Sequence, residues 1–330
     1  MKTMAKKVTQ EDIARETGLS KYAVSRAIAG KSGTSDATRE RVLKACKKLG
    51  YVRISHTVSS QYILLMIPKL DLIDPAFWMK VVQGVESAAT KGGYLLHIKI
   101  IRDDDDPLVA QDLENAAGVI FAGYKSVDYA CKYKGRKPSV LMTYPPEDMF
   151  QMDCLYCADI ESSRALCQKL LDWGHRKFVY CGDGSRPSAK HRLDGVKQKL
   201  AEQGLELMEQ LTLTDLQDLQ QLMQHWQLQK NNGVLPTAIL CENDTIVNLV
   251  MRAISLLQMR VPEDVSIVSF NNDPRDVGAI AVAGMGIDKS GFGKEAVYML
   301  LDRISRSNMP FKRVAIMHQY YDNHTAGPCG

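Results

Sequence analysis

The sequence predicts an α/β protein in which a small all-helical module precedes a doubly wound, two-lobed body. Two observations carry this prediction: residues 9–51 form three short capped helical patterns, and from Tyr62 onward apolar runs alternate with amphipathic stretches. Residues 1–53 hold thirteen Lys and Arg against five Asp and Glu, a net charge of +8, whereas the whole chain is +4. The remaining 277 residues therefore carry −4, which suits a module that neutralises phosphates attached to a body that binds something else.

The first helix is predicted from its terminal signals. Thr9 and Asp12 have the spacing of a capping box, in which the Thr hydroxyl accepts from a first-turn amide and the carboxylate reaches back. Ile13 and Ala14 would face inward, and Gly18 can take the positive φ that ends the helix.

Ser20 can cap a second helix, in which Val24, Ala27 and Ile28 share one apolar stripe. A third helix is expected to begin at Ser35. Its apolar stripe consists of Val42, Ala45, Cys46 and Leu49. The second helix then leaves four side chains facing outward, namely Lys21, Tyr22, Ser25 and Arg26.

Two helices joined by a Gly-containing turn, with cationic residues outside the second, form a helix-turn-helix arrangement. The second helix of this motif lies in the DNA major groove. Arg26 could form a fork to guanine, while Lys21 and Tyr22 could read bases or anchor phosphate. The alternative for any single charged residue is a solvated basic face on a structural helical bundle.

The module resembles the headpiece of the LacI/GalR family of transcriptional regulators. The residues that carry the resemblance are Asp12-Ile13-Ala14, Gly18-Leu19-Ser20, Val24-Ser25-Arg26, Ser35, Thr38-Arg39, Val42 and Leu49-Gly50-Tyr51. The resemblance implies that Lys21, Tyr22 and Arg26 read bases and that Ser20 and Ser25 lie close to the DNA backbone. Ala23 and Ala29 depart from the family pattern, which usually has Thr and often Asn there.

The segment after Tyr51 also departs from the family. Relatives usually continue with Pro-Asn and a hinge helix whose Leu wedges into the minor groove. Residues 52–61 contain no Pro, Asn or Leu, and their Ser, Thr and Val lower helix propensity, so residues 54–61 are predicted to be a weakly ordered linker. Arg53 and His56 remain candidate phosphate contacts.

The body is predicted to contain parallel sheets covered by helices on both faces, and its length of about 270 residues favours two lobes with a ligand cleft between them. Predicted strands are 62–67, 94–100, 118–121, 139–142, 178–181, 237–241 and 265–270. Predicted helices are 76–91, 162–173, 189–203 and 243–257.

The family resemblance continues through this body. It rests on Asp74-Pro75-Ala76-Phe77-Trp78 with Gly84, Trp173-Gly174-His175-Arg176-Lys177, Arg192 with Gly195, Thr237-Ala238-Ile239 with Asn243-Asp244, and residues 261–267. It implies a periplasmic-binding-protein-like effector domain with three crossovers between lobes and a dimer interface. The domains would be a DNA-binding headpiece at 1–53, a hinge at 54–61 and an effector-binding and dimerisation domain at 62–330. The N-terminal lobe would hold 62–159 and a segment returning from about Ser290.

The same resemblance implies an effector pocket. Its residues would be Phe77 and Trp78 as an apolar or stacking wall, Arg192 and Asn243 as hydrogen-bond donors, Asn271 opposite them, and Thr143 at a strand end. Such a mixture suits a sugar. Because Asn271 and Thr143 stand where relatives often carry Asp, Arg192 is expected to be less compensated, which favours an anionic ligand such as a sugar phosphate or sugar acid.

Each pocket residue also has a purely structural interpretation. Phe77 and Trp78 could be helix core, Arg192 a surface cation, and Asn243 a helix N-cap.

No metal, cofactor or catalytic machinery is expected. Cys154 and Cys157 form a single Cys-x-x-Cys without the second pair that a zinc site needs, and the eight scattered Cys suit reduced thiols. No Ser-His-Asp elbow or His-Glu-x-x-His motif is present. The charged start of the chain and the lack of a long apolar span indicate a cytoplasmic protein and argue against a transport receptor.

The function predicted is a sequence-specific DNA-binding regulator, a repressor, that binds a pseudo-palindromic operator as a homodimer and answers to a small ligand, a sugar or sugar derivative. The alternatives are a family member whose diverged pocket binds a non-sugar ligand or none, and, more remotely, a doubly wound metabolic enzyme.

Overall fold

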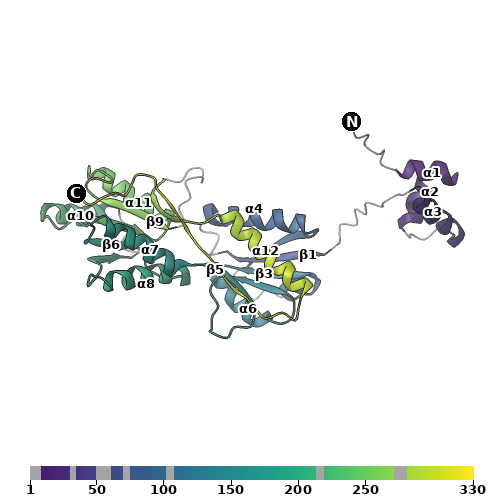
Figure 1. The fold of residues 1–330 in the computed structure, drawn as a ribbon, viewed down its shortest axis with the longest axis horizontal. Coiled ribbons are helices and arrows are strands. Elements are labelled where there is room, and N and C mark those ends of the chain that lie inside the picture. The colour runs from purple at the N-terminus through teal and green to yellow at the C-terminus, as the bar shows by residue number, and fades with distance from the viewer. Residues whose placement is uncertain are drawn as a thin grey trace. The chain divides into compact units, whose positions relative to one another are not determined.

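The computed structural model describes residues 9–29, 35–49, 61–69, 75–101, 108–212, 219–270 and 281–330. The chain divides into two compact units, Met1–Val58 and Ser59–Gly330, called here the headpiece and the effector body. Figure 1 shows their helices and strands along the chain. No helix within the described ranges is long and apolar enough to cross a membrane.

The described part of the headpiece contains three helices that begin where the sequence predicts. They are α1 (Gln10–Thr17), α2 (Lys21–Ala29) and α3 (Asp36–Leu49). The capping box is confirmed, since the Asp12 amide donates to Thr9 Oγ1 at 3.3 Å and the Thr9 amide donates to Asp12 Oδ2 at 2.8 Å. Gly18 ends α1 with φ of 64°, a left-handed conformation that glycine adopts without strain.

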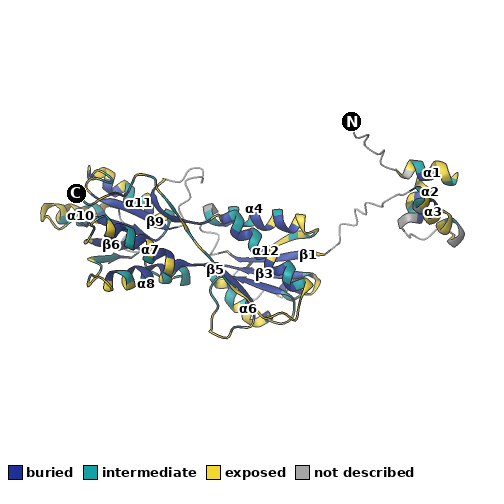
Figure 2. Ribbon diagram, viewed as in Figure 1, coloured by how far each residue is buried: buried dark blue, intermediate teal, exposed yellow. Residues whose placement is uncertain are grey.

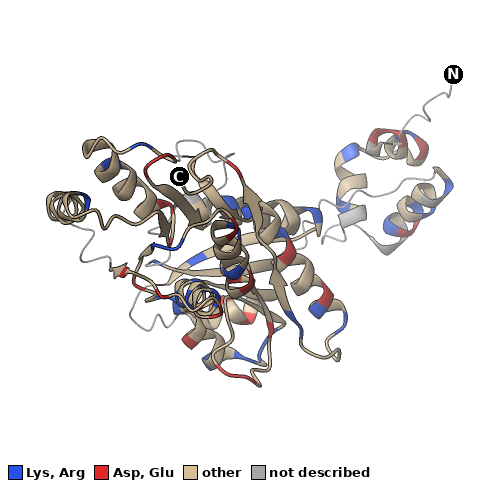
Figure 3. Cartoon of the chain, turned by 60° about the vertical axis from the view of Figure 1, so that its left-hand side comes forward, with Lys and Arg blue, Asp and Glu red and all other residues tan. Residues whose placement is uncertain are grey.

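One small apolar core joins the three headpiece helices. Ile13, Val24 and Val42 are fully buried, and Ala27 and Ala45 are nearly so. These residues occupy the predicted stripes, one from each helix, so the stripes are what hold the helices together. Basic and acidic residues both occur along these helices (Figure 3).

The first lobe of the effector body is built on a six-stranded parallel sheet with the order β11-β5-β4-β3-β1-β2. Its strands are β1 (Tyr62–Pro68), β2 (Leu95–Ile101), β3 (Gly118–Ala122), β4 (Ser139–Met142), β5 (Asp153–Cys157) and β11 (Arg313–Ile316). Its helices are α4 (Pro75–Lys91), α5 (Leu108–Asn115), η2 (Tyr124–Ser126), α6 (Val127–Tyr133) and α12 (Lys289–Ser305). Two apolar clusters, one containing α4 and α12 and the other α5 and α6, cover the sheet (Figure 2).

The second lobe repeats this plan on a sheet with the order β12-β10-β9-β8-β6-β7. Its strands are β6 (Phe178–Cys181), β7 (Glu209–Leu211), β8 (Ala238–Cys241), β9 (Ser266–Phe270), β10 (Ala283–Gly286) and β12 (Gln319–Tyr321), of which β12 pairs antiparallel. Its helices are α7 (Asp159–Asp172), α8 (Pro187–Ala201), α10 (Leu219–Asn231) and α11 (Asp244–Leu256). One cluster contains α7 and α8, and another contains α10 and α11.

Three connections cross between the lobes, as the family resemblance implies. The chain passes from β5 to α7, returns from β10 to α12, and passes again from β11 to β12. The first and third crossings bring Asp159 and His318 together, with Asp159 Oδ1 3.8 Å from His318 Nε2. The junction between the lobes is therefore built from side chains far apart in sequence.

Close packing of α12 on α4 fixes the returning segment to the first lobe. A Cβ on Gly84 would lie 2.0 Å from the Ser290 carbonyl oxygen, and one on Gly293 would lie 2.1 Å from that of Val81. Only glycine allows the two helix backbones to approach this closely. Gly84 and Gly293 therefore serve the packing of these two helices.

Candidate functional site

The exposed face of α2 is the candidate DNA-binding surface. The Ala23 amide donates to Ser20 Oγ at 3.1 Å, so Ser20 caps the helix as predicted. Because Val24 and Ala27 turn into the headpiece core, the opposite side of the helix faces solvent, and Tyr22 is 70% exposed. Lys21 and Ser25 are also exposed.

Two of these side chains act on each other. Arg26 Nη1 donates to Tyr22 Oη at 3.0 Å, and the guanidinium carbon lies 5.6 Å from the centroid of the Tyr22 ring. Lys21 Nζ lies 2.9 Å from Glu11 Oε1, which is also exposed. Exposed ion pairs are weak, so Lys21 can exchange Glu11 for a phosphate at little cost. Arg53, His56 and the predicted hinge lie outside the described residues.

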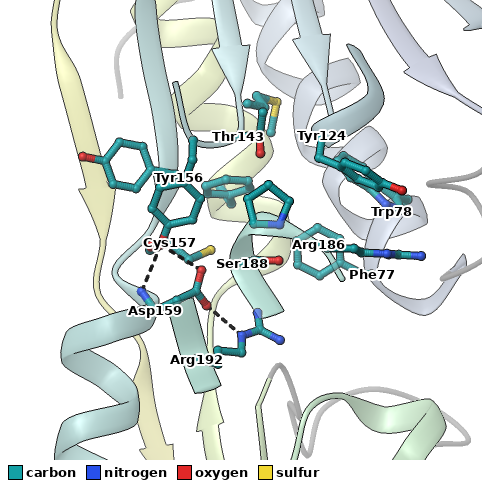
Figure 4. Close-up of a pocket in the computed structure, with 15 residues that line it drawn as sticks. Phe77, Trp78, Tyr124, Thr143, Tyr156, Cys157, Asp159, Arg186, Ser188 and Arg192 are labelled. Carbon is teal, nitrogen blue, oxygen red and sulfur yellow. Dashed lines mark hydrogen bonds and ion pairs between the residues drawn. The ribbon is translucent and has the colours of Figure 1, made fainter. Parts of the chain in front are cut away.

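The effector body contains a cavity of about 110 Å³ between its lobes, called here the inner pocket. It lies at the carboxyl ends of strands from both sheets, where ligands of open α/β sheets bind. The residues that line it are Phe77, Trp78, Gly123, Tyr124, Met142, Thr143, Tyr144, Tyr156, Cys157, Asp159, Arg186, Pro187, Ser188, Arg192 and Phe292 (Figure 4).

Aromatic rings form much of the wall. Phe77 and Trp78 stand at the start of α4 and pack edge to face with centroids 5.2 Å apart. Both side chains also pack in the first lobe's core. They therefore line the pocket and serve as helix core at the same time. Tyr144 packs on Tyr156 with centroids 4.6 Å apart and meets His191 of α8 edge to face at 4.0 Å. Tyr144 therefore links the first lobe to the second.

A buried ion pair closes the inner end of this pocket. Arg192 Nε donates to Asp159 Oδ1 at 2.8 Å, and Arg192 Nη1 donates to the Glu242 carbonyl at 2.9 Å. Both charged side chains are almost completely buried. Tyr144 Oη donates to the Cys157 carbonyl at 2.5 Å and lies 3.0 Å from Asp159 Oδ2. The Asp159 carboxylate thus has partners on both sides.

Burial and charge set the ionisation of the groups around this pair. Burial alone would lower the pKa of Arg192, but the Asp159 charge offsets that effect and raises the pKa. Burial, reinforced by Asp159, raises the pKa of Tyr144. Burial also raises the pKa of Glu242, whose carboxylate accepts from the Gly184 amide at 3.1 Å. A charged Arg192 and a neutral Tyr144 are the forms present at neutral pH.

The structure brings together four of the six residues assigned to the effector pocket by sequence, namely Phe77, Trp78, Thr143 and Arg192. Asn243 is not among the lining residues. Its side chain accepts from the Ile246 amide at 3.1 Å and caps α11, as the structural interpretation holds. Asn271 lies outside the described residues. The roles of all six in effector binding stay predictions.

One expectation about Arg192 is wrong. The sequence suggested that its charge would be poorly compensated, but Asp159 pairs with it directly, so Arg192 is not available as the anion receptor. The surface-cation alternative is equally wrong, because Arg192 is only 4% exposed. Sequence reasoning missed Asp159, since its partner lies 33 residues away and no local signal links the two. It also missed Tyr124, Tyr144 and Arg186.

Cys154 and Cys157 lie in β5 and are buried. Burial raises the pKa of Cys154 to about 11, which disfavours the thiolate that binds metals. Across the described ranges, no group of three or more His, Cys, Asp or Glu could hold a metal ion.

Two protein families match this chain. Residues 9–53 match the family described as "Bacterial regulatory proteins, lacI family", and residues 167–322 match the "Periplasmic binding protein-like domain". The two matches together span more than half of the chain and fall on the headpiece and the effector body respectively.

Curated relatives match over most of their lengths. The chain is 25% identical over 283 residues to the HTH-type transcriptional regulator DegA of Bacillus subtilis, covering 81% of this chain and 82% of DegA. It is 24% identical over 311 residues to the HTH-type transcriptional repressor CytR of Escherichia coli, covering 90% of this chain and 89% of CytR.

Solved structures share the fold. The lac repressor dimer bound to operator and the anti-inducer ONPF is similar with a TM-score of 0.69 and 21% identity, covering 97% of this chain and 99% of that one. The complex of the transcriptional regulator CelR with cellobiose gives a TM-score of 0.66 and 21% identity, covering 96% and 99%. At this identity the likeness concerns the fold.

Proposed function

Because this chain is a LacI-family transcriptional regulator with a periplasmic-binding-protein-like effector domain, we propose that it is a repressor controlled by a small ligand. It binds a pseudo-palindromic operator as a homodimer, and a sugar or sugar derivative in the inner pocket changes its operator affinity. As a regulator and not an enzyme, it binds this ligand without turning it over.

The observation that carries the proposal is the exposed face of α2. Its capped N-terminus presents Lys21, Tyr22, Ser25 and Arg26 on the side opposite the headpiece core, which is the geometry a recognition helix needs. Ser20 and Arg53 are the other proposed DNA contacts. The Tyr22–Arg26 contact holds the guanidinium on this face, where it could reach guanine O6 and N7.

A homodimer follows from both DNA geometry and the effector body. One recognition helix contacts too few base pairs for genomic specificity, and two related by a twofold axis double the site. In the body, β2 is an edge strand on which Leu95, Ile98 and Ile100 are 47%, 50% and 48% exposed. Exposed apolar side chains on an edge strand favour association with another chain, and a second copy of this chain would cover them.

The inner pocket suits a small ring with polar substituents. Aromatic side chains offer faces for apolar CH groups, while Thr143 and Ser188 place hydroxyls in the lining (Figure 4). Asn243 and Asn271 are proposed to complete the binding groups if the lobes close on the ligand. The CelR structure holds cellobiose, which supports a sugar-like ligand here.

Ligand binding would act through the angle between the lobes. Tyr144 of the first lobe contacts both Asp159 at the first crossover and His191 on α8, so this interface depends on how the lobes sit. A ligand that prefers one arrangement shifts the population toward it. A coupling free energy of about 1 to 3 kcal/mol would change operator affinity about fivefold to about 150-fold.

The test begins with selection of duplexes from a random-sequence pool by the purified full-length protein. The expected product is a pseudo-palindrome whose affinity falls steeply as salt rises, measured by fluorescence anisotropy. A sugar panel is then added to the complex, and at least one member should change operator affinity. Failure to retain any duplex, with or without ligand, would end the proposal; retention without response to sugars would leave the alternative of a non-sugar ligand or none.

The dimer is tested separately by sedimentation velocity. Ile98→Glu on β2 should convert dimer to monomer and weaken operator binding, because it buries a charge in the proposed interface. Leu228→Glu on α10, at a position 63% exposed in the other lobe, is the matched control and should remain dimeric. A dimer that survives Ile98→Glu would place the interface elsewhere.

A further inference from the structure

A wider recess opens beside the inner pocket and is called here the outer recess. The two share Tyr124, Tyr144, Arg186 and Pro187, so a ligand in one can extend into the other. The outer recess encloses about 550 Å³, against about 110 Å³ for the inner pocket. Its other lining residues are Lys125, Val127, Asp128, Pro145, Pro146, Gly184, Ser185, Lys190 and His191.

Three cations line this outer recess against one acid. Arg186 and Lys190 come from the start of α8, and Lys125 comes from η2, while Asp128 is the acidic lining residue. Within the described ranges, the side chains of Arg186, Lys190 and Lys125 make no hydrogen bond or ion pair, although the Lys190 amide donates to the Arg186 carbonyl at 2.8 Å. Arg186 lies over the Tyr124 ring, with its guanidinium carbon 5.9 Å from the centroid. Its five donors are thus free for a ligand.

The two ends of the combined cavity differ in charge. At the inner end, Asp159 and Arg192 neutralise each other at 2.8 Å. At the outer end, Arg186 points away from that pair toward Tyr124 (Figure 4). The two acids near the loop before α8 accept hydrogen bonds from backbone amides, Glu242 from Gly184 and Asp183 from Ser185 at 2.9 Å, and the Arg186 charge acts on Glu242 without a hydrogen bond between them.

We infer that the effector is a monosaccharide-sized ring bearing an anionic group, phosphate or carboxylate, which Arg186 and Lys190 bind in the outer recess. Guanidinium groups bind such anions through two parallel hydrogen bonds, and an ammonium adds a second charge. The ring occupies the inner pocket, and its anionic group reaches the outer recess past the residues that the two share. This inference rests on the proposed function and moves anion recognition from Arg192 to Arg186.

Isothermal titration calorimetry on the full-length protein tests this inference with matched pairs of probes. The pairs are ribose with ribose 5-phosphate and glucose with glucose 6-phosphate, and gluconate and inorganic phosphate are titrated separately. At least one anionic sugar should bind ten- to a hundredfold more tightly than its neutral counterpart, as expected for charge-assisted hydrogen bonds. Gluconate distinguishes a carboxylate from a phosphate as the anion, and inorganic phosphate alone should bind weakly because it lacks the ring.

Arginine variants test whether the preference for anionic over neutral sugars arises in the outer recess. Arg186→Gln should remove most of the tenfold or greater preference while changing neutral-sugar affinity less than about threefold, and Arg186→Lys should retain part of it. Arg164→Gln is the matched control, since it removes a cation that pairs with Glu202 on the surface of the second lobe. It should leave the preference intact, and operator binding without ligand should be the same in all three variants.

Three results would overturn the inference. These are equal or tighter binding of the neutral sugars, a charge preference that survives Arg186→Gln, and no binding by any anionic sugar. The first two would leave the proposed function standing, because a neutral or differently held effector could still control operator affinity. Failure of the wild type to bind any operator, with or without ligand, would instead count against the proposed function.

Discussion

The helix caps of the headpiece and the buried ion pairs of the effector body join residues over very different chain distances. In the headpiece, Thr9 pairs with Asp12 and Ser20 with Ala23, each only three residues away. In the effector body, Asp159 pairs with Arg192 33 residues on, and Asp153 forms two hydrogen bonds with Arg303, 150 residues away.

This difference determines what a mutation can do in each unit. Headpiece helices are specified by local caps and by a core of a few apolar side chains, so loss of one cap removes one hydrogen bond. The body holds charges away from water, and removing one partner leaves the other buried and unpaired. We therefore expect polar substitutions to cost more in the body than in the headpiece.

The largest effect is expected from Asp159→Ala. It leaves the buried Arg192 guanidinium without its carboxylate and should lower the free energy of unfolding of the effector body by about 3 to 5 kcal/mol. Urea denaturation followed by tryptophan fluorescence measures this. Asp302→Ala is the control, because Asp302 pairs with Arg306 and Lys312 at the surface, and it should cost much less. Equal losses of unfolding free energy in the two variants would contradict the difference expected between a buried and a surface ion pair.

A pH effect of similar size is expected from His318. Its side chain is fully buried near Asp159, its Nδ1 pairs with Ser162 Oγ at 2.8 Å, and burial lowers the pKa of the imidazole from 6.5 to about 4. The unfolded chain binds a proton below pH 6.5 and the folded chain does not. Stability should therefore fall by about 3 kcal/mol as pH falls from about 6.5 to about 4, and stay level with respect to His318 above that range.

The measurement is the urea unfolding free energy across this pH range for the wild type and His318→Gln. Glu242 titrates in the opposite sense, since its raised pKa favours the protonated carboxyl in the folded state and so costs stability as pH rises. Because Glu242 is present in both proteins, subtracting the pH profile of His318→Gln from that of the wild type leaves the contribution of His318. A difference that does not change with pH would show that His318 is not neutral in the folded body.

A smaller effect, on DNA rather than on folding, is expected from Arg26→Ala. If Arg26 reads guanine, the variant should lose about 1 to 3 kcal/mol of binding free energy at one base position of the selected operator. Anisotropy with operators substituted one base pair at a time measures this, and Lys44→Ala on the exposed side of α3 is the control. A uniform loss over all sequences would make Arg26 a phosphate contact.

The smallest effect is expected from Thr9→Ala. It removes one cap of α1 and should cost the headpiece about 1 kcal/mol, while the unfolding transition of the effector body stays unchanged. Hydrogen exchange measured by mass spectrometry reports the two units separately. Increased exchange in the body as well would mean that the two units unfold together.

Much of the fold was predictable from local patterns. The helix starts at Gln10 and Lys21 follow from Thr9 and Ser20, and the predicted strands lie within a residue or two of β1, β2, β3, β4, β6, β8 and β9. The strands β5, β7, β10, β11 and β12 and the helices α5, α6, α10 and α12 were not predicted. Three-residue strands such as β7 and β12 and a weakly periodic helix such as α10 carry little local signal.

The pocket was predictable only in part. Phe77 and Trp78 follow a recognisable sequence pattern at the start of α4, and the structure places them in the lining. The charge of the pocket was predicted from the wrong residue, since Arg192 alone cannot reveal that Asp159 lies 2.8 Å away. Arg186 carries no motif, and its place in the outer recess depends on how α8 meets Tyr124 of the other lobe.

The sequence by itself determined the three capped helices, the exposed cations of the second helix and the alternation that builds two parallel sheets. These features arise from hydrogen bonds and apolar periodicity within a few residues, which the order of amino acids specifies directly. The tertiary structure alone decided which charges neutralise each other and which stay open to a ligand. Three chain crossings bring distant segments to one junction, and the balance of charge there depends on distances between atoms that are remote in sequence.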